Sequence, residues 1–408
     1  MFTTNQSHFK HSSFTDYLSR PIILRRNFGF DRKYSEIKNA KKSESFIENC
    51  IDSNEPLFES RCERIKVDKT INGTFYVLFT GIHRFNKEGI NDKNNNLIDK
   101  KILRFISDRG KLIEIHVDQI IRILPMFVLQ KKTAVEILTE QQRSFLFNFK
   151  ACHNVKELMT LMPANLQFPT GKFLNNLTDS WLKRSISNYE YLTWLNLLSG
   201  RTFNSAYSYP VFPWILSDYE SSSINLDDSK VYRDLSKPIG ALNSARLSKL
   251  KKLRDDNVEE ENSQFLYRST YSCAFHVFHY LVRLEPFTSL HIIMQDGKFD
   301  VAHRLFSSIV NSYERITSTF FNFRELIPEF FFNSEFLSNM DKFTFGGGID
   351  NVCLPPWSKS PIDFVYKNRR ALESEIVSNR INEWIDLIWG YKQTGQAANE
   401  ADNVFDPH

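Results

Sequence analysis

The segment 354–398 constrains the fold of this chain most, because it has the pattern of a turn, a capped helix, a second amphipathic helix and a stop. Two consecutive prolines at its start push the residues before them into extended backbone. Ser360 then offers an N-cap hydroxyl, Pro361 suits the first helical position, and Asp363 places a carboxylate on the first turn. These signals predict a helix that starts close to Pro361.

A second helix is predicted directly after the first. Ser378 or Asn379 can cap it, and Gly390 can end it in the left-handed conformation. The segment holds no arrangement of groups that performs catalysis, so it indicates a surface built for packing. The apolar stripe of the second helix must find cover from residues 175–350 or stay partly exposed. Its residues have spacings of three and four, which predict one buried face: Ile381, Trp384, Ile385 and Ile388.

Length and composition exclude several classes of protein. A chain of 408 residues can form two or three domains with substantial cores. It has only 14 glycines beside 36 phenylalanines, which disfavours the glycine-rich loops that cradle phosphates. Its net charge of +4 is too small to indicate nucleic-acid binding by itself.

The cysteines and the hydropathy predict the compartment. The five cysteines are scattered without a paired spacing, which fits a reducing environment. No apolar run approaches the roughly 18 residues that a membrane span requires, and no signal peptide is visible. We therefore expect a cytoplasmic protein with, at most, peripheral contact to endomembranes. Residues 1–55 form a basic N-terminal extension that is predicted to be a poorly ordered tail, with a transit peptide as the alternative.

Residues 56–163 show strand patterns followed by one helix. A polar loop is expected at 86–100, and Asn154 is expected to cap the helix, whose apolar residues share one face. This order resembles a pleckstrin-homology (PH) barrel closed by a single C-terminal helix. The predicted strands lie at 73–79, 83–85, 113–117, 126–129, 134–138 and 145–149.

The rest of the chain is predicted to be a linker, 164–174, and a mainly helical domain, 175–408. Ser187 and Glu190 form a capping box for a helix that ends at Gly200. The fold class is therefore α+β, with a helical domain that contains long irregular segments. Further helices are expected at 272–283 and 300–317, a non-helical run at 207–219, extended backbone at 220–245 and a charged loop or frayed helix at 247–263.

Ordered motifs in this second region carry a family resemblance. ISNYEYL at 186–192 resembles ISNFEYL, and YRDLSKPIGALN at 232–243 resembles FRDLSKPIGALN. The other motifs are YPVFPW at 209–214, LVRLEPF at 281–287, ELIPEF at 325–330 and WIDLIWGYKQ at 384–393. They occur in the order found in the BEACH domain family (beige/Chediak–Higashi, neurobeachin and relatives), which the chain resembles over roughly residues 175–405.

The resemblance implies both architecture and role. BEACH domains follow a PH-like domain, although residues 120–138 match the family motif there only weakly, with Ile123 and Pro125 as departures. Family members are scaffolds in vesicle trafficking, in the biology of lysosome-related organelles and in autophagy. The resemblance also implies a C-terminally incomplete BEACH domain without WD repeats.

Candidate chemistry is sparse. His276 and His279 lie one helical turn apart, and His291 and His303 follow, but no carboxylate or thiol at matching spacing completes a metal site. A helix packed through its aromatic residues is the competing interpretation. The common catalytic and nucleotide-binding motifs are absent from the sequence. We assign no catalytic residue, cofactor, metal or small-molecule substrate, and we expect a protein that is not an enzyme.

Charged residues in and near the family motifs are predicted to form a structural polar network. Buried irregular backbone needs hydrogen-bond partners, and buried charges need partners of their own. A catalytic carboxylate site is the alternative. The predicted members are Arg233, Asp234, Arg283, Glu285, Arg304, Glu325 and Glu329.

Partners are predicted to be proteins of the trafficking machinery, bound in a groove between the PH-like and BEACH domains through aromatic and arginine anchors. The alternative is a peripheral membrane adaptor that binds acidic lipids through the PH-like domain and the basic tail. For the lipid alternative, the available cations are Lys66, Lys69, Arg84, Lys87, Lys131 and Lys132. The predicted groove residues are Arg122, Phe127, Lys131, Tyr189, Tyr191 and Trp194.

Overall fold

The computed structural model describes residues 56–80, 100–141, 143–167, 171–256 and 265–406. The chain divides into two compact units, one that ends at Phe173 and one that begins at Leu174. The predicted N-terminal extension, 1–55, lies outside the described residues, and so does the strand expected at 83–85.

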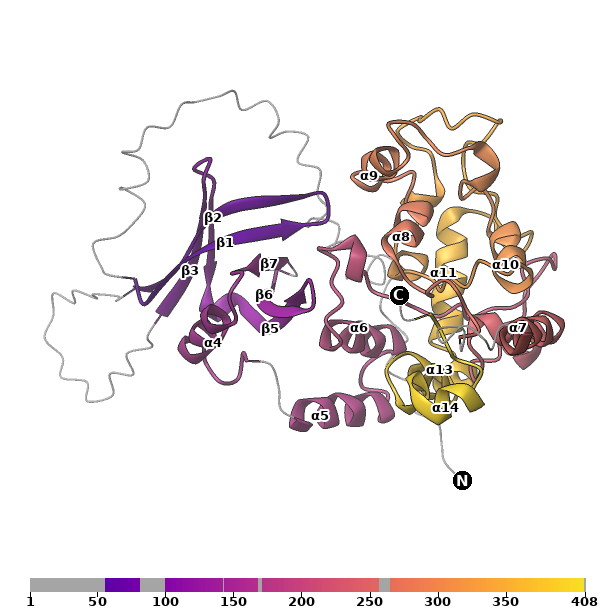
Figure 1. Cartoon of the computed structure of the whole chain (residues 1–408), viewed down its shortest axis with the longest axis horizontal. Helices are drawn as coiled ribbons and strands as arrows, with labels where there is room; N and C mark the ends of the chain where they lie inside the picture. The colour runs from indigo at the N-terminus through magenta and orange to yellow at the C-terminus, as the bar shows by residue number, and fades with distance from the viewer. Residues whose placement is uncertain (1–55, 81–99, 142, 168–170, 257–264, 407–408) are drawn as a thin grey trace, which may run out of the picture. The chain divides into compact units, whose positions relative to one another are not determined.

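The first unit, called the sheet unit below, is an antiparallel sheet that curls around its own core (Figure 1). Within the described residues the hydrogen-bonded strand order is β4-β3-β2-β1-β7-β6-β5, which begins and ends at β4 and β5, so we describe a curled sheet and not a closed barrel. The strands are β1 (Phe58–Lys66), β2 (Lys69–Thr80), β3 (Lys100–Ser107), β4 (Leu112–His116), β5 (Ile120–Val128), β6 (Lys131–Thr139) and β7 (Ser144–Asn148).

Two strands have no counterpart among the predicted ones. β1 buries Phe58 and Cys62 but leaves the residues between them partly or fully exposed, so its alternation is weak. β3 begins at Lys100, at the end of the expected polar loop, and pairs with β2 along its whole length. β1 forms a tight hairpin with β2 and also pairs with the distant β7, and β3 pairs with β2 across residues 81–99. Local alternation does not reveal the last two pairings.

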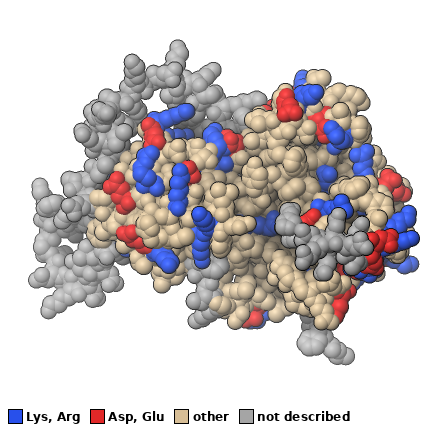
Figure 2. All heavy atoms as spheres, in the orientation of Figure 1, with Lys and Arg blue, Asp and Glu red and all other residues tan. Residues whose placement is uncertain are grey.

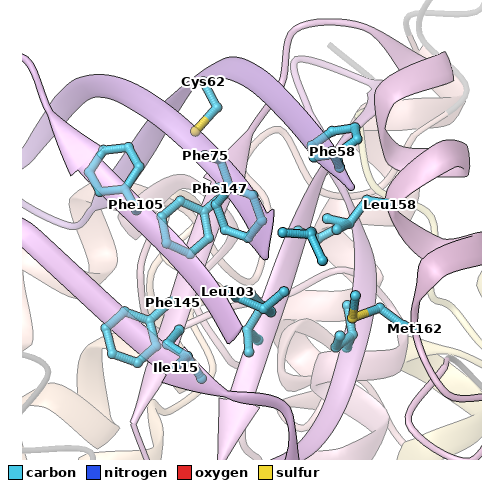
Figure 3. Packing of buried hydrophobic residues seen from close by; sticks show 14 of the residues in the cluster. Phe58, Cys62, Phe75, Leu103, Phe105, Ile115, Phe145, Phe147, Leu158 and Met162 are labelled. Carbon is cyan, nitrogen blue, oxygen red and sulfur yellow. The ribbon is translucent and has the colours of Figure 1, made fainter. Parts of the chain in front are cut away.

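Aromatic side chains fill the inside of the curl (Figure 3). The ring centroid of Phe147 lies 4.9 Å from that of Phe75 and 5.3 Å from that of Phe105. Helix α4 (Cys152–Leu161) covers this core with Val155 and Leu158. Each fully buried ring contributes about 2–3 kcal/mol to folding, so this cluster is the main source of stability in the unit.

The predicted cap of α4 is wrong. The N-cap is Ala151, whose side chain makes no capping bond, and Asn154 lies inside the first turn. Its Nδ2 donates to Ser60 Oγ at 2.9 Å, so the amide ties the helix to β1.

Part of the expected linker packs on the exposed edge of β5. Leu166 O accepts from Ile123 N at 2.9 Å, and Arg122 Nη1 donates to Asn165 O at 2.9 Å. Leu166 itself belongs to the buried core. A covered edge cannot pair with another chain, so residues 163–167 act as part of the sheet unit.

The second unit, called the helical unit below, combines short helices with long irregular segments (Figure 1). Two predicted caps are confirmed: Ser187 Oγ accepts from Glu190 N, and Ser360 Oγ accepts from Asp363 N. Helix α5 (Gly171–Leu182) crosses the boundary between the two units. The helices that follow it are α6 (Asn188–Leu198), α7 (Ser244–Asp256), α8 (Ala274–Tyr280), α9 (Phe287–Met294), α10 (Ile309–Ser318), α11 (Pro361–Leu372), α12 (Glu375–Ser378), α13 (Ile381–Ile388) and α14 (Gly395–Glu400).

Several predicted helices differ from those observed. α8 and α10 are shorter than expected, and α9 was not predicted. The described part of the charged segment, 247–256, belongs to α7, which buries Leu250 and Arg246, and the rest of that segment lies outside the described residues. The segment 220–245, expected to be extended, contains 3-10 turns at Ser229–Val231 and Ile239–Ala241.

The C-terminal helices confirm the buried stripe at Ile381, Trp384 and Ile388, whereas Ile385 is only half-buried and Leu387 is buried beside the stripe. Trp384 is fully buried, and its Nε1 donates to Glu325 Oε1, so the stripe finds cover inside the unit.

The ends of the second helix also differ from the prediction. The N-cap of α13 is Arg380 rather than Ser378 or Asn379, because the short α12 comes between the two predicted helices. Gly390 has φ −97°, which is not left-handed. It is required for space, since a Cβ there would lie 2.6 Å from Asp386 Cα.

Candidate functional site

A buried ion pair ties three irregular segments of the helical unit to helix α13. Arg233 Nη1 lies 2.7 Å from Glu325 Oε2, with side-chain exposures of 0% and 2%. Glu325 also accepts from Trp214 N and from Trp384 Nε1, each at 3.1 Å. The carboxylate therefore fixes the irregular runs around 214, 233 and 325 against α13.

Other buried arginines donate hydrogen bonds to backbone carbonyl groups. Arg283 Nε donates to Asp350 O at 2.7 Å, and its Nη1 donates to Phe306 O. Arg246 Nη2 donates to Ile239 O at 2.6 Å and its Nη1 to Ile316 O at 2.6 Å. Irregular buried segments leave carbonyl groups without ladder partners, and these guanidinium groups supply them.

Glu329 is a buried carboxyl with a different environment. Tyr209 Oη donates to Glu329 Oε1 at 2.6 Å. Burial raises the pKa of Glu329 to about 7, against an ordinary value near 4.5, although the Tyr209 hydrogen bond lowers it. Phe287 and Phe203 pack their rings on Tyr209. The pair is enclosed, which suits a structural role better than exchange with a substrate.

The predicted polar network is therefore several separate groups. Arg233 and Glu325 form one, while Glu329 and Arg283 bond elsewhere. The other three lie nearer the surface: Asp234 pairs with Arg380 and Lys237, Glu285 accepts from Ser289, and Arg304 pairs with Asp300. Sequence reasoning missed Arg246, Tyr209 and Trp384 as polar partners, although Tyr209 and Trp384 begin two of the family motifs.

The predicted contact residues of the sheet unit lie on β5 and at the start of β6. Arg122 sits over the ring of Phe173, with its Cζ 5.1 Å from the centroid. Lys131 and Phe127 are exposed, Phe127 by 56%. Leu129, in the β5–β6 turn, is 91% exposed. Single exposed apolar side chains are common on folded surfaces, so the informative feature is the grouping of two of them at one turn.

That turn also holds two residues in the left-handed region. Val128 pairs with Lys131, so Leu129 and Gln130 are the central positions of a two-residue hairpin turn, with φ values of 48° and 63°. Such turns favour Asn-Gly, and a non-glycine residue there costs about 1 kcal/mol or more. We define Phe127 and Leu129 as the hairpin patch.

The predicted contact residues of the helical unit are mostly internal. Tyr191 is 6% exposed, and its ring stacks on Trp181 with the centroids 4.5 Å apart. The guanidinium of Arg369 lies 4.1 Å from the ring centroid of Tyr189, whose hydroxyl oxygen is buried. Trp194 is half-buried. Tyr189 and Tyr191 thus hold α6 to its neighbours, which removes them from the exposed anchors.

The described lysines expected to bind lipids do not gather at one place. Lys66 and Lys69 flank the β1–β2 turn and both pair with Asp68. Strand register places this turn level with the C-terminal part of β6, whereas Lys131 and Lys132 begin that strand. Arg84 and Lys87 lie outside the described residues. Among the described helices, none combines the length and the apolar character that crossing a bilayer requires.

His276, His279 and His291, but not His303, line a cavity of about 280 Å³ between α8, α9 and α10. Burial, and then the positive charge of Arg324, lower the pKa of His276 to about 3 and that of His279 well below its usual value. In the part of the chain that the structure describes, His, Cys, Asp and Glu form no cluster suited to a metal ion. Arginines dominate the charged lining instead.

Comparison with known proteins identifies both units. The Beige/BEACH domain family matches residues 179–408, and the PH domain associated with Beige/BEACH matches residues 62–163. The chain is 46% identical over 233 residues to BEACH domain-containing protein B of Arabidopsis thaliana, covering 56% of this chain and 9% of that protein. It is 40% identical over 314 residues to BEACH domain-containing protein lvsD of Dictyostelium discoideum, covering 76% of this chain and 10% of that protein.

Among solved structures, the C-terminal domain of an unknown protein from Leishmania infantum aligns at 14% identity with a TM-score of 0.21, covering 29% of this chain and 90% of that one. That likeness is too weak to inform the fold. The chain spans about a tenth of the length of the curated relatives it matches. The family matches occur in the order that the sequence motifs predicted, and the chain belongs to the Beige/BEACH domain family, with its associated PH domain ahead of the BEACH domain.

Proposed function

We propose that this chain is a non-enzymatic scaffold of membrane trafficking that binds protein partners of the trafficking machinery. Membership of the Beige/BEACH domain family carries the proposal, because BEACH proteins are generally scaffolds of this kind. The buried charged groups support the proposal, since they hold backbone and side chains together and have structural partners. These groups are Glu325, Arg233 and Arg283. A role at lysosomal or autophagic membranes, with peripheral attachment, is the finer form of the proposal.

The hairpin patch is the proposed contact surface of the sheet unit. It presents Phe127 and Leu129 to solvent on a two-residue turn whose backbone conformation is costly for leucine. Costly local conformations persist where function maintains them, and large exposed apolar side chains commonly anchor protein interfaces. Lys131 adds a cation beside the patch.

Proximity labelling of the tagged full chain in its own cells tests this proposal. The variant is Phe127→Ser combined with Leu129→Asn, and the matched control is Leu112→Ser, which removes an exposed leucine from β4 of the same unit. The wild type and the control should label one shared set of vesicle-coat, tethering or fusion proteins, and the double variant should lose members of that set. A set that contains no trafficking proteins contradicts the scaffold role, and an unchanged set in the double variant contradicts the hairpin patch.

A second experiment tests whether the sheet unit binds lipids. Flotation of the purified chain with vesicles, with and without phosphoinositides, measures this binding directly. Lys66 and Lys69 share Asp68 and lie away from Lys131, so the lysines do not form one lipid-binding cluster. We therefore expect that phosphoinositides do not increase flotation of the wild type, and that Lys131→Gln does not change it. Flotation that depends on Lys131 would favour the membrane-adaptor alternative.

A further inference from the structure

The cavity between α8, α9 and α10 has a basic lining that the scaffold role does not explain. Three arginines line it, Arg304, Arg315 and Arg324, against the single carboxylate of Asp300. The lining histidines have lowered pKa values and are neutral near pH 7. Three positive charges against one negative charge leave the described lining with a net charge of +2.

Arg324 provides a donor that nothing in the described structure uses. Its Nε donates to Asn322 Oδ1 at 2.7 Å, which fixes the plane of the guanidinium, and its Cζ lies 6.0 Å from the ring centroid of Tyr280. Its Nη1 is buried without a hydrogen-bond partner. A buried unsatisfied donor costs about 1–3 kcal/mol, and more when charged, so a ligand that accepts this hydrogen bond is strongly favoured.

The other two arginines are held in place with donors to spare. Asp300 Oδ1 engages Nε and Nη2 of Arg304, and Arg315 Nη1 donates to His303 O at 2.9 Å. Each guanidinium carries five N–H donors, so these bonds position the groups without exhausting them. Asn311 and Ser312 of α10 add neutral polar groups to the lining.

We propose that this cavity binds the phosphate monoester of a phosphorylated side chain in a partner peptide. A phosphomonoester carries a charge of roughly −1.5 to −2 near neutral pH and has three strong acceptor oxygens, which matches a lining charge of +2 and several guanidinium groups better than a carboxylate does. The inference rests on the proposed scaffold role, and it names the chemical class of one partner.

A peptide fits this site better than a membrane surface does. Acidic membranes attract clusters of about four to eight lysines and arginines on an open face. No lysine is among the described residues that line the cavity, and Asp300 stands beside Arg304. Figure 2 shows basic and acidic side chains interspersed over the face drawn, with no continuous basic field.

Binding of capped phospho-amino acids to the purified full chain tests the inference. The probes are N-acetyl amides of phosphoserine and phosphotyrosine, with capped glutamate as the carboxylate control, measured by calorimetry and by the rise in melting temperature. We expect at least one phosphorylated probe to bind, and capped glutamate to bind at least about tenfold more weakly. No binding of either phosphorylated probe in the millimolar range, or equal binding of glutamate, overturns the proposal.

Variants localise the site. Arg324→Gln and, independently, Arg315→Gln should each weaken phosphate binding about tenfold or more, whereas Arg268→Gln, an exposed arginine outside the lining, should not. The melting temperature of each variant, measured without probe, shows whether it is folded. Two independent cavity variants are used so that the test still stands if one of them fails to fold. Unchanged affinity in both folded cavity variants overturns the assignment, and so does binding only to phosphoinositide vesicles. Because the probes need no cellular partner, this result is independent of the labelling experiment on the hairpin patch.

Discussion

Arg233 and Glu325 form a fully buried ion pair, with Nη1 and Oε2 2.7 Å apart, and the backbone N of Trp214 and Nε1 of Trp384 donate to the same carboxylate. Removing one partner of a buried pair leaves an uncompensated charge, which costs about 3–5 kcal/mol. We therefore expect Arg233→Met or Glu325→Leu alone to lower the free energy of unfolding by about this amount, measured by urea denaturation.

A double-mutant cycle gives the matched control for that pair. Arg233→Met together with Glu325→Leu should cost clearly less than the two single changes added, because no unpaired charge remains. A cycle on Arg233 and Glu285 should be additive within about 0.5 kcal/mol, since Glu285 is bonded to Ser289. Additivity between Arg233 and Glu325 would show that the pair is not coupled.

The raised pKa of Glu329 leads us to expect that the stability of the protein depends on pH. This pKa is raised by burial to about 7 in the folded chain, from near 4.5 when exposed, so the folded state binds the proton more tightly than the unfolded state. Stability from this group is fully present below pH 4.5 and is lost as the pH rises through about 7. Each pH unit between these two pKa values corresponds to about 1.4 kcal/mol of stability.

The Glu329→Gln variant checks this assignment. Glutamine can still accept the hydrogen bond of Tyr209 but cannot ionise. The variant should therefore lose less stability than the wild type between pH 5 and pH 8, by about 3 kcal/mol at most. Equal losses in the two proteins, measured by denaturant unfolding, would mean that Glu329 does not titrate in this window.

Leu129 predicts a stabilising substitution. It has φ 48° and is 91% exposed, so its side chain contributes almost no burial to offset the cost of its backbone. Asparagine tolerates this conformation and suits the first central position of such a turn. Leu129→Asn should raise the free energy of unfolding by about 1 kcal/mol in thermal unfolding. Leu112 lies on strand β4, and the control substitution Leu112→Asn should not raise it.

Substitution of Gly390 is expected to destabilise the protein. A Cβ at this position would lie 2.6 Å from Asp386 Cα, which is backbone and cannot turn aside. Gly390→Ala should cost about 1–3 kcal/mol. Gly171→Ala, where a Cβ meets nothing within 4 Å, should be neutral, and equal effects of the two changes would exclude crowding as the cause.

Local signals predicted those features whose cause is local. The caps at Ser187 and Ser360 depend on residues within one helical turn, and both are confirmed. The cap at Asn154 failed because the amide has a better partner in Ser60 on β1. The end of α13 failed for a similar reason, since Gly390 serves close packing against Asp386 rather than a left-handed turn.

Motif order and short-range patterns were enough to predict the family, the change from strands to helices, the two caps and most of the buried stripe through Trp384, because these depend on neighbouring residues and on periods of two or three to four residues. Tertiary packing was needed to show that Arg233 pairs with Glu325, 92 residues away, that the hairpin patch is exposed, and that Arg315 and Arg324 line one cavity. Hydrogen-bond partners and cavities are formed by segments far apart along the chain, and no local period encodes which segments those are.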